Sequence, residues 1–303
     1  MRILIIGCNG QVGWELQRTL APLGAVTAVD YPEIDLSRAD SVKSILRSAS
    51  PELIVNAAAY TAVDRAEQEP ALAEKINADA PALLARQARQ LDAALIHYST
   101  DYVFDGDKEG AYIESDPPNP QNVYGKTKLR GEIAVAEAGA RYIVLRTSWV
   151  YSDRSSNFLL TMLRLAAERE QLRIVADQHG TPTWSRTLAR TTARIIDQEL
   201  LQGTGKLFAH TSGLYHATGA GVTTWHGFTQ AILEEHRRLN GQRRPLKTRE
   251  VLPITTEEYP LPAKRPRNSL LSNDKLAQTF GIDPQPWRRQ LSELMAEMFT
   301  ITE

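Results

Sequence analysis

The sequence predicts an α/β protein with a Rossmann-like, doubly wound parallel sheet and a smaller C-terminal α/β lobe that binds the substrate. Three observations support this fold class. Apolar strand-like runs alternate with helical segments in the first half, a glycine-rich turn follows the first run, and polar clusters follow later runs. Strands that alternate with helices form parallel sheets, which bind ligands beyond the carboxyl ends of their strands.

The first strand is expected at residues 2–6, a continuous apolar run without polar alternation, as in a strand buried on both faces. Val12, Leu16 and Leu20 then recur at helical spacing, and Pro22 and Gly24 close that helix. Further strands are expected at residues 25–29, 53–55, 94–98 and 142–145, and further helices at 71–91 and 122–137.

The second half of the chain is less regular. Helices are expected at residues 156–169, 184–201, 224–239 and 286–299, joined by Gly- and Pro-rich connections such as 260–266. We expect residues 1–150 to form an NAD(P)-binding Rossmann domain. Residues 151–303 should form mainly the substrate-binding lobe, with the chain crossing back to the first domain.

Composition narrows the function classes. The 303 residues are 42% hydrophobic and 23% charged, as in ordinary globular proteins, and the formal net charge of −1 argues against a nucleic-acid partner. No apolar run approaches the roughly 20 residues that span a bilayer, so no membrane partner is expected. The single cysteine, Cys8, and a start without a signal-peptide core indicate a cytoplasmic protein.

The glycine loop predicts a dinucleotide cofactor. Gly7, Gly10 and Gly13 follow a buried strand and open a helix, with G-x-x-G-x-x-G spacing that includes Gln11 and Val12. Glycines at such a turn let the backbone approach a pyrophosphate, and the helix N-terminus offers free N–H groups to the anion.

Asp30 ends the second strand, where a carboxylate accepts hydrogen bonds from the adenosine ribose and disfavours a 2′-phosphate. NADH is therefore expected. NADPH stays open, because Arg38 or another cation could approach. Asp35 and Leu36 lie in the next turn and border the adenine, or Asp35 caps a helix instead.

Tyr124 and Lys128 are four residues apart, so on a helix they share one face at about 6 Å. A free phenol has a pKa of about 10, and a nearby ammonium favours the phenolate and lowers that pKa. The pair is a candidate acid–base site. Alone, the same spacing also fits a half-buried tyrosine beside a solvated lysine.

Several motifs occur in a fixed order along nearly the whole chain. They are the glycine loop, Asn56-Ala57-Ala58-Ala59, Thr61-Ala62-Val63-Asp64, Ser99-Thr100-Asp101-Tyr102-Val103-Phe104, Tyr124-Gly125-x-x-Lys128, Arg146-Thr147-Ser148-Trp149-Val150-Tyr151, Gln178-x-Gly180-x-Pro182-Thr183 and Arg265-Pro266-x-Asn268-Ser269. Together they resemble the extended short-chain dehydrogenase/reductases, and more closely the family of dTDP-4-dehydrorhamnose reductases.

The resemblance implies hydride transfer from NADH or NADPH to C4 of a dTDP-4-keto sugar, giving dTDP-L-rhamnose. It implies that Tyr124 donates the proton, Lys128 holds the nicotinamide ribose, and Thr100 polarises the substrate oxygen. The implied cofactor residues are Gly7, Gly10, Gln11, Val12, Gly13, Asp30, Asp35, Leu36, Ala59, Tyr60, Thr61, Tyr124 and Lys128. The implied substrate residues are Val63, Thr100, Asp101, Tyr102 and Trp149, although Trp149 also fits a core aromatic.

One local difference separates reaction types. Related enzymes that dehydrate nucleotide sugars carry Asp-Glu after the threonine, as an acid–base pair. Here Tyr102 follows Thr100-Asp101, which favours simple ketone reduction.

In some members of the family, glutamates hold Mg²⁺ between two subunits. Glu15 and Glu297 stand at two matching positions, but the third position is Arg186, a cation that repels Mg²⁺ and can pair with the carboxylates. Mg²⁺ at a dimer interface is therefore disfavoured, no catalytic metal is expected, and monomer and homodimer both stay open.

Two other functions compete with the reductase. One is another nucleotide-sugar reductase or epimerase on the same scaffold. The other is a non-catalytic regulatory binding subunit, as in relatives that became subunits of methionine adenosyltransferase. The presence of Thr100, Tyr124 and Lys128 argues against a subunit without activity.

Overall fold

A six-stranded parallel sheet of order β10-β5-β4-β3-β1-β2 forms the centre of the computed structural model, which describes residues 1–203, 205–240 and 245–300. Its strands are β1 (Arg2–Ile6), β2 (Ala25–Val29), β3 (Leu53–Asn56), β4 (Ala94–Thr100), β5 (Arg141–Thr147) and β10 (Gly213–His216). The predicted Rossmann-like fold class is thereby confirmed. β3, β4 and β5 are each a little longer than the sequence indicated.

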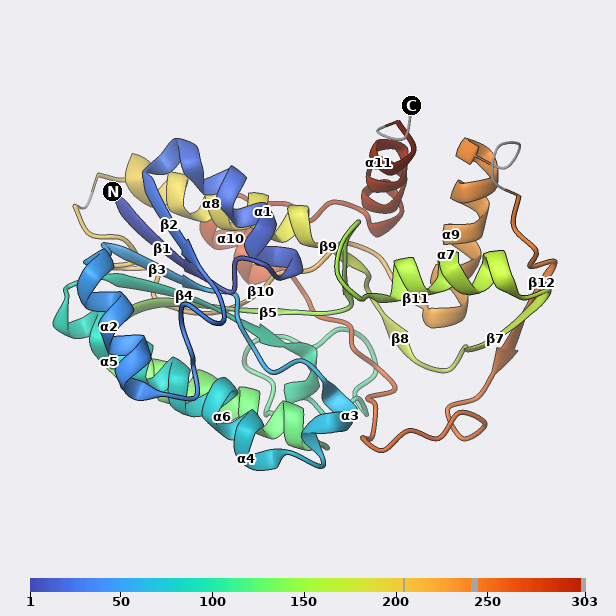
Figure 1. The fold of residues 1–303 in the computed structure, drawn as a ribbon, viewed down its shortest axis with the longest axis horizontal. Helices are drawn as coiled ribbons and strands as arrows, with labels where there is room; N and C mark the ends of the chain where they lie inside the picture. The colour runs from blue at the N-terminus through green and yellow to red at the C-terminus, as the bar shows by residue number, and fades with distance from the viewer. Residues whose placement is uncertain (204, 241–244, 301–303) are drawn as a thin grey trace.

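Helices cover both faces of the sheet (Figure 1). One layer consists of α1 (Gln11–Leu20), α8 (Ser185–Leu201) and α10 (Asp274–Phe280), and the other of α2 (Ala39–Ala49), α5 (Ala80–Gln90) and α6 (Val123–Glu137). The sequence reasoning assigned no helix at 39–49. The signal was present, because Val42, Ile45, Leu46 and Ala49 recur at helical spacing and face the core.

The chain returns to the sheet after residue 150. β10 extends the sheet by pairing with β5, and α8 packs against α1. No strand was predicted at residues 213–216, since a four-residue run gives little periodic signal.

The second lobe lies at the right of Figure 1. Its helices are α7 (Phe158–Glu168), α9 (Trp225–Asn240) and α11 (Trp287–Thr300), and its parallel pair is β7 (Gln171–Val175) with β12 (Glu250–Ile254). The short pairs are β6 (Val150–Tyr151) with β9 (Thr183–Trp184), and β8 (His179–Gly180) with β11 (Thr223–Thr224). Across the described ranges, no helix has the length and apolar character needed to span a bilayer.

The helix predicted at residues 71–91 is interrupted. It comprises α4 (Pro70–Glu74), a π-helical turn (Lys75–Asp79) and α5, and the short α3 (Val63–Ala66) precedes it. Pro81 has no N–H, so the carbonyl of Asn77 one turn earlier lacks its usual helical partner. That carbonyl would lie 2.1 Å from a Cβ atom at Gly131, so glycine there allows α6 to pack directly on the turn.

A buried ion pair ties α6 to the sheet. Arg146 on β5 donates from Nε to Glu132 Oε1 at 2.9 Å and from Nη2 to Oε2 at 2.6 Å. The two side chains are only 5% and 4% exposed. Removing one partner from such a pair leaves an uncompensated buried charge.

We therefore predict that Glu132→Gln lowers the free energy of unfolding by about 3–5 kcal/mol, measured by urea denaturation. Replacing both partners, as in Arg146→Met with Glu132→Leu, should cost less than the single change because no charge is left unpaired. A double variant less stable than Glu132→Gln would contradict this account.

Candidate active site

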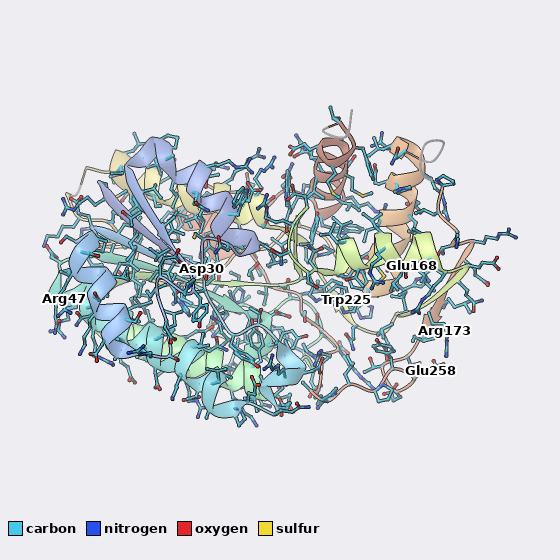
Figure 2. All side chains as sticks on the ribbon, viewed as in Figure 1. Asp30, Arg47, Glu168, Arg173, Trp225 and Glu258 are labelled. Atoms are coloured by element: carbon cyan, nitrogen blue, oxygen red, sulfur yellow. The ribbon has the colours of Figure 1, made fainter. Side chains whose placement is uncertain are left out.

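The predicted site residues gather where the strand order reverses. β1 lies between β2 and β3, so the connections after β1 and β3 leave in opposite directions and open a crevice at the carboxyl ends of these strands. The glycine loop follows β1, Asp30 follows β2, and residues 57–61 follow β3. In Figure 2, Asp30 lies near this end of the sheet and Trp225 lies between the sheet and the second lobe.

The glycine loop has the geometry that a pyrophosphate requires. Gly7 has φ +87°, a backbone angle that residues with a side chain rarely adopt. A Cβ atom at Gly13 would lie 2.0 Å from the Gly7 carbonyl oxygen, so only glycine fits there. Gly10 caps α1 without any side-chain hydrogen bond, so the first N–H groups of α1 are available to an anion. The Gln11 side chain is held by Ser152, because Gln11 Oε1 accepts from Ser152 Oγ at 2.8 Å. The loop therefore fits a dinucleotide.

Asp30 is fixed by the backbone. Its two oxygens accept from the N–H groups of Asn9 and Tyr31, both at 2.8 Å. Because an ionised carboxylate has about four lone-pair sites, it can still accept hydrogen bonds from a ribose.

Asp35 forms a turn with Ser37, accepting from its N–H at 2.9 Å and its hydroxyl at 2.7 Å. These hydrogen bonds lower the pKa of Asp35. The alternative that Asp35 is a helix N-cap was wrong, because α2 begins after Arg38. Leu36 packs at the edge of the core beneath α2.

The loop containing Ala59, Tyr60 and Thr61 is held by the π-helical turn. Asn77 accepts from the Tyr60 N–H at 2.8 Å and donates to the Tyr60 carbonyl at 3.1 Å. The Tyr60 hydroxyl donates to Glu69 at 2.6 Å, so its ring is directed to α4. The Tyr60 phenol is therefore already paired within the protein.

Thr100, Asp101 and Tyr124 form the centre of the site. The Thr100 hydroxyl donates to Asp101 Oδ1 at 2.9 Å and accepts from the Tyr102 N–H at 3.2 Å, and it lies close enough to the Tyr124 phenol to influence its pKa. Gly125 brings this helix close, since a Cβ there would lie 2.1 Å from the Tyr102 carbonyl oxygen. Asn122 caps α6 by accepting from the Gly125 N–H at 2.8 Å.

Burial dominates the electrostatics of the site. It raises the pKa of Tyr124 well above its ordinary value, the Thr100 hydroxyl opposes that shift, and the Asp101 charge adds to it. The expected lowering of the Tyr124 pKa by Lys128 is thus wrong, because desolvation dominates the shift. Burial also raises the pKa of Asp101 to about 6, although hydroxyls of Ser269 and Thr100 partly offset the effect.

Lys128 is almost fully buried, at 1% exposure. Its Nζ donates to the Tyr98 carbonyl at 2.6 Å and lies 3.3 Å from His97 Nε2. Desolvation lowers the pKa of Lys128 to about 8, while Glu132 opposes this shift. Sequence reasoning missed His97, although a histidine inside an apolar strand is itself a signal of a polar partner.

A cavity of about 1110 Å³ begins at Tyr102 and extends into the second lobe. Tyr102 packs edge-on against Tyr124, with ring centroids 5.5 Å apart, and Val63 joins the same cluster. Five basic side chains line the cavity: Arg169, Arg173, Lys264, Arg265 and Arg267. Arg173 and Glu258 form an ion pair at 2.9 Å toward the right of Figure 2.

Trp149 has φ +49° and stacks on Trp225 with centroids 3.5 Å apart and planes 8° from parallel. Phe158 packs on Trp225 as well, and the Trp225 indole N–H donates to Gln178 at 3.1 Å. Trp225 lines the cavity but was not predicted, because an aromatic residue at a helix start carries no site signal.

Glu15, Arg186 and Glu297, the residues considered above for an interface Mg²⁺, lie together and form ion pairs. Arg186 donates from Nε to Glu15 at 3.1 Å and from Nη1 to Glu297 at 2.7 Å. Among the described residues, no group of three His, Cys, Asp or Glu could hold a metal ion. The guanidinium therefore supplies positive charge between these two carboxylates.

The chain is similar to known proteins along nearly its whole length. Residues 1–300 match the family model described as RmlD substrate binding domain. A dTDP-4-dehydrorhamnose reductase of Burkholderia thailandensis is 49% identical over 288 residues, covering 95% of this chain and 96% of that protein.

Two solved structures are similar over 98% of this chain and 99% of their own. One is a dTDP-4-dehydrorhamnose reductase of Clostridium acetobutylicum, with TM-score 0.87 and 38% identity. The other is a dTDP-4-dehydrorhamnose reductase of Bacillus anthracis in complex with NADP, with TM-score 0.85 and 33% identity. With its α/β fold, glycine loop and buried Tyr124 and Lys128, this chain belongs to the RmlD substrate binding domain family.

Proposed function

We propose that this protein is an NAD(P)H-dependent dTDP-4-dehydrorhamnose reductase. It reduces the C4 ketone of dTDP-6-deoxy-L-lyxo-4-hexulose to give dTDP-L-rhamnose, the last step in making this activated sugar. Relatives from Burkholderia thailandensis and Escherichia coli that cover 95% and 100% of this chain carry this name. The observation that supports it most is the placement of Tyr124 against Thr100 at the carboxyl end of β4, with Lys128 one turn further along the same helix as Tyr124.

Tyr124 is the proton donor in this proposal. A ketone that accepts hydride becomes an alkoxide, which is a stronger base than a phenolate. The raised pKa keeps Tyr124 protonated before reaction, so the phenol holds the proton that the developing alkoxide needs.

Thr100 orients the reacting oxygen. Its only hydroxyl proton goes to Asp101 Oδ1, so polarising a substrate oxygen requires the hydroxyl to rotate. Asp101, with a pKa of about 6, is the group that holds Thr100 in the present orientation. The residue after Asp101 is Tyr102, and no carboxylate follows Thr100-Asp101 to remove a proton in a dehydration.

The glycine loop, Asp30 and Lys128 would hold the dinucleotide. The bare N–H groups at the start of α1 receive the pyrophosphate, and Asp30 receives the adenosine ribose. When bound, the reduced nicotinamide supplies the hydride. We propose that residues 1–150 mainly bind this cofactor and that later residues mainly bind the substrate, in the cytoplasm where reduced nicotinamide is available.

The cavity beyond Tyr102 supports a nucleotide-sugar substrate. Its volume slightly exceeds the roughly 300–1,000 Å³ typical of ligand sites. Its five basic side chains outnumber its four acidic ones, two of which pair with Arg173 and Arg267, so the lining offers counter-charge to a diphosphate. We propose that Val63, Asp101, Tyr102 and Trp149 contact the sugar end. Two alternatives are another nucleotide-sugar reductase and a regulatory subunit, and turnover assays with the 4-keto sugar nucleotide distinguish both from the proposed function.

Tyr124→Phe should lower kcat by about 10²–10⁴-fold, because it removes the proton donor while keeping the ring. NADH oxidation with the 4-keto sugar nucleotide measures this. Tyr98→Phe is the matched control, since that phenol bonds Thr192 on the opposite face of β4. Equal rates for Tyr124→Phe and wild type would remove Tyr124 from the reaction, and an inactive wild type would favour the regulatory subunit.

Asp30→Ser should shift cofactor preference toward NADPH. A carboxylate repels a 2′-phosphate by about 1 kcal/mol or more at contact, so the NADH-to-NADPH ratio of kcat/KM should fall about fivefold or more. Asp40→Ser, an exposed change in the first turn of α2, should leave the ratio unchanged.

Sedimentation in Mg²⁺ and in EDTA should give the same mass, because Arg186 already neutralises Glu15 and Glu297. An oligomer that dissociates in EDTA would contradict this assignment. Reductase activity should also be insensitive to EDTA.

A further inference from the structure

Three buried polar side chains contact one another in turn between β3 and α6, the helix that carries Tyr124. Asn56 on β3, His97 on β4 and Lys128 on α6 are exposed by 0%, 0% and 1%. Asn56 and His97 are register partners on adjacent strands, with Asn56 Nδ2 3.1 Å from His97 Nδ1. On the other side, His97 Nε2 lies 3.3 Å from Lys128 Nζ.

The backbone determines the direction of this chain. Asn56 Oδ1 accepts from the Ala58 N–H at 3.2 Å, so the amide nitrogen of Asn56 must face His97. That nitrogen can only donate, which makes His97 Nδ1 the acceptor. Burial and the charge of Lys128 hold the pKa of His97 well below its ordinary value, so the ring is neutral and carries its one proton on Nε2.

The Nε2–H group therefore points at Lys128. An ammonium has three donors and no acceptor, so Nε2–H meets it donor to donor. A neutral amine can instead accept from Nε2–H while still donating to the Tyr98 carbonyl at 2.6 Å. The arrangement thus favours loss of a proton from Lys128. It lowers the pKa of Lys128, as desolvation also does.

Other charges around Lys128 come from α6, β5 and the end of β4. Glu132, one turn further along α6, favours the ammonium but is bound to Arg146 on β5. Tyr124 is neutral, and Asp101 faces Tyr124 and Thr100. From β4, the His97 ring and the Tyr98 carbonyl both lie at hydrogen-bond distance from Lys128, and of these two only His97 is titratable on this side.

We propose that His97, held by Asn56, is a positioning residue for the proposed reaction: its Nε2–H fixes Lys128 and makes this lysine exchange its proton near neutral pH. The inference rests on the proposed function for its kinetic consequence. The orientation of the imidazole itself does not depend on any reaction. Lys128 then serves as a proton-exchanging group beside Tyr124 and not only as a fixed cation for the ribose.

The first test uses the cofactor-free wild type and needs no turnover. Long-range ¹H–¹⁵N NMR of labelled histidine should show His97 as the Nε2–H tautomer. The ¹³Cε resonance of Lys128, assigned with Lys128→Arg, should titrate near the pKa of about 8 and not near 10. An Nδ1–H tautomer, or a lysine that stays charged to pH 10, would overturn the proposal.

The second test reverses the hydrogen bond. In Asn56→Asp the carboxylate still accepts from Ala58 but also accepts from His97 Nδ1–H, so Nε2 becomes an acceptor for the ammonium. The Lys128 midpoint should rise by about one unit, and the variant-to-wild-type ratio of kcat/KM should be about fivefold higher at pH 9 than at pH 7. His97→Leu should shift the alkaline limb the same way, and His97→Gln, which keeps an N–H donor, should restore it.

A merely structural role predicts a different result. Activity would then fall in proportion to thermal stability at every pH, with unchanged profile shape. His236→Leu, a buried histidine on α9 in the second lobe, is the control and should behave in that way. Turnover without the expected NMR result would overturn the inference about His97 but keep the proposed reductase. The expected NMR result without turnover would keep the inference about His97 but overturn the proposed reductase.

Discussion

The docking of α6 on the sheet is the constraint on which the site depends. The glycine at 125 brings the helix against the backbone of Tyr102, and the Arg146–Glu132 ion pair anchors it from β5. Lys128 adds a third attachment through the Tyr98 carbonyl. Because all three attachments are buried, Tyr124 is held beside Thr100 with little freedom, and preorganised donors of this kind stabilise charge that develops in a transition state.

Burying this many polar groups has an electrostatic consequence. Desolvation raises the pKa values of Tyr124 and Asp101 and lowers those of Lys128 and His97, so each group shifts toward its neutral form. A neutral phenol is the form that can donate a proton to a reduced ketone. The low-polarity environment that makes these groups costly to bury thus also prepares them for reduction.

The two lobes are continuous at the site. β5 ends at Thr147, and Trp149 then stacks on Trp225 of the second lobe, so the end of the sheet and the cavity share one aromatic wall. Segment 263–269 returns to the same place, where Arg265 pairs with Asp64 at 2.6 Å and Asn268 holds the Lys108 carbonyl at 2.7 Å. Residues distant in the sequence thereby come together beside this cavity.

The sequence by itself determined the parallel sheet, the glycine loop and the Tyr124–Lys128 pair, because apolar runs, glycine spacing and helical spacing are local signals. It did not reveal β10, the π-helical turn, or the partners Trp225 and His97, since a short strand or a single aromatic has no period. It also gave the wrong direction for the Tyr124 pKa. Only the tertiary structure decided that direction, because desolvation depends on all the atoms packed around the Tyr124 phenol. Helical spacing in the sequence reveals only one neighbour of Tyr124, which is Lys128.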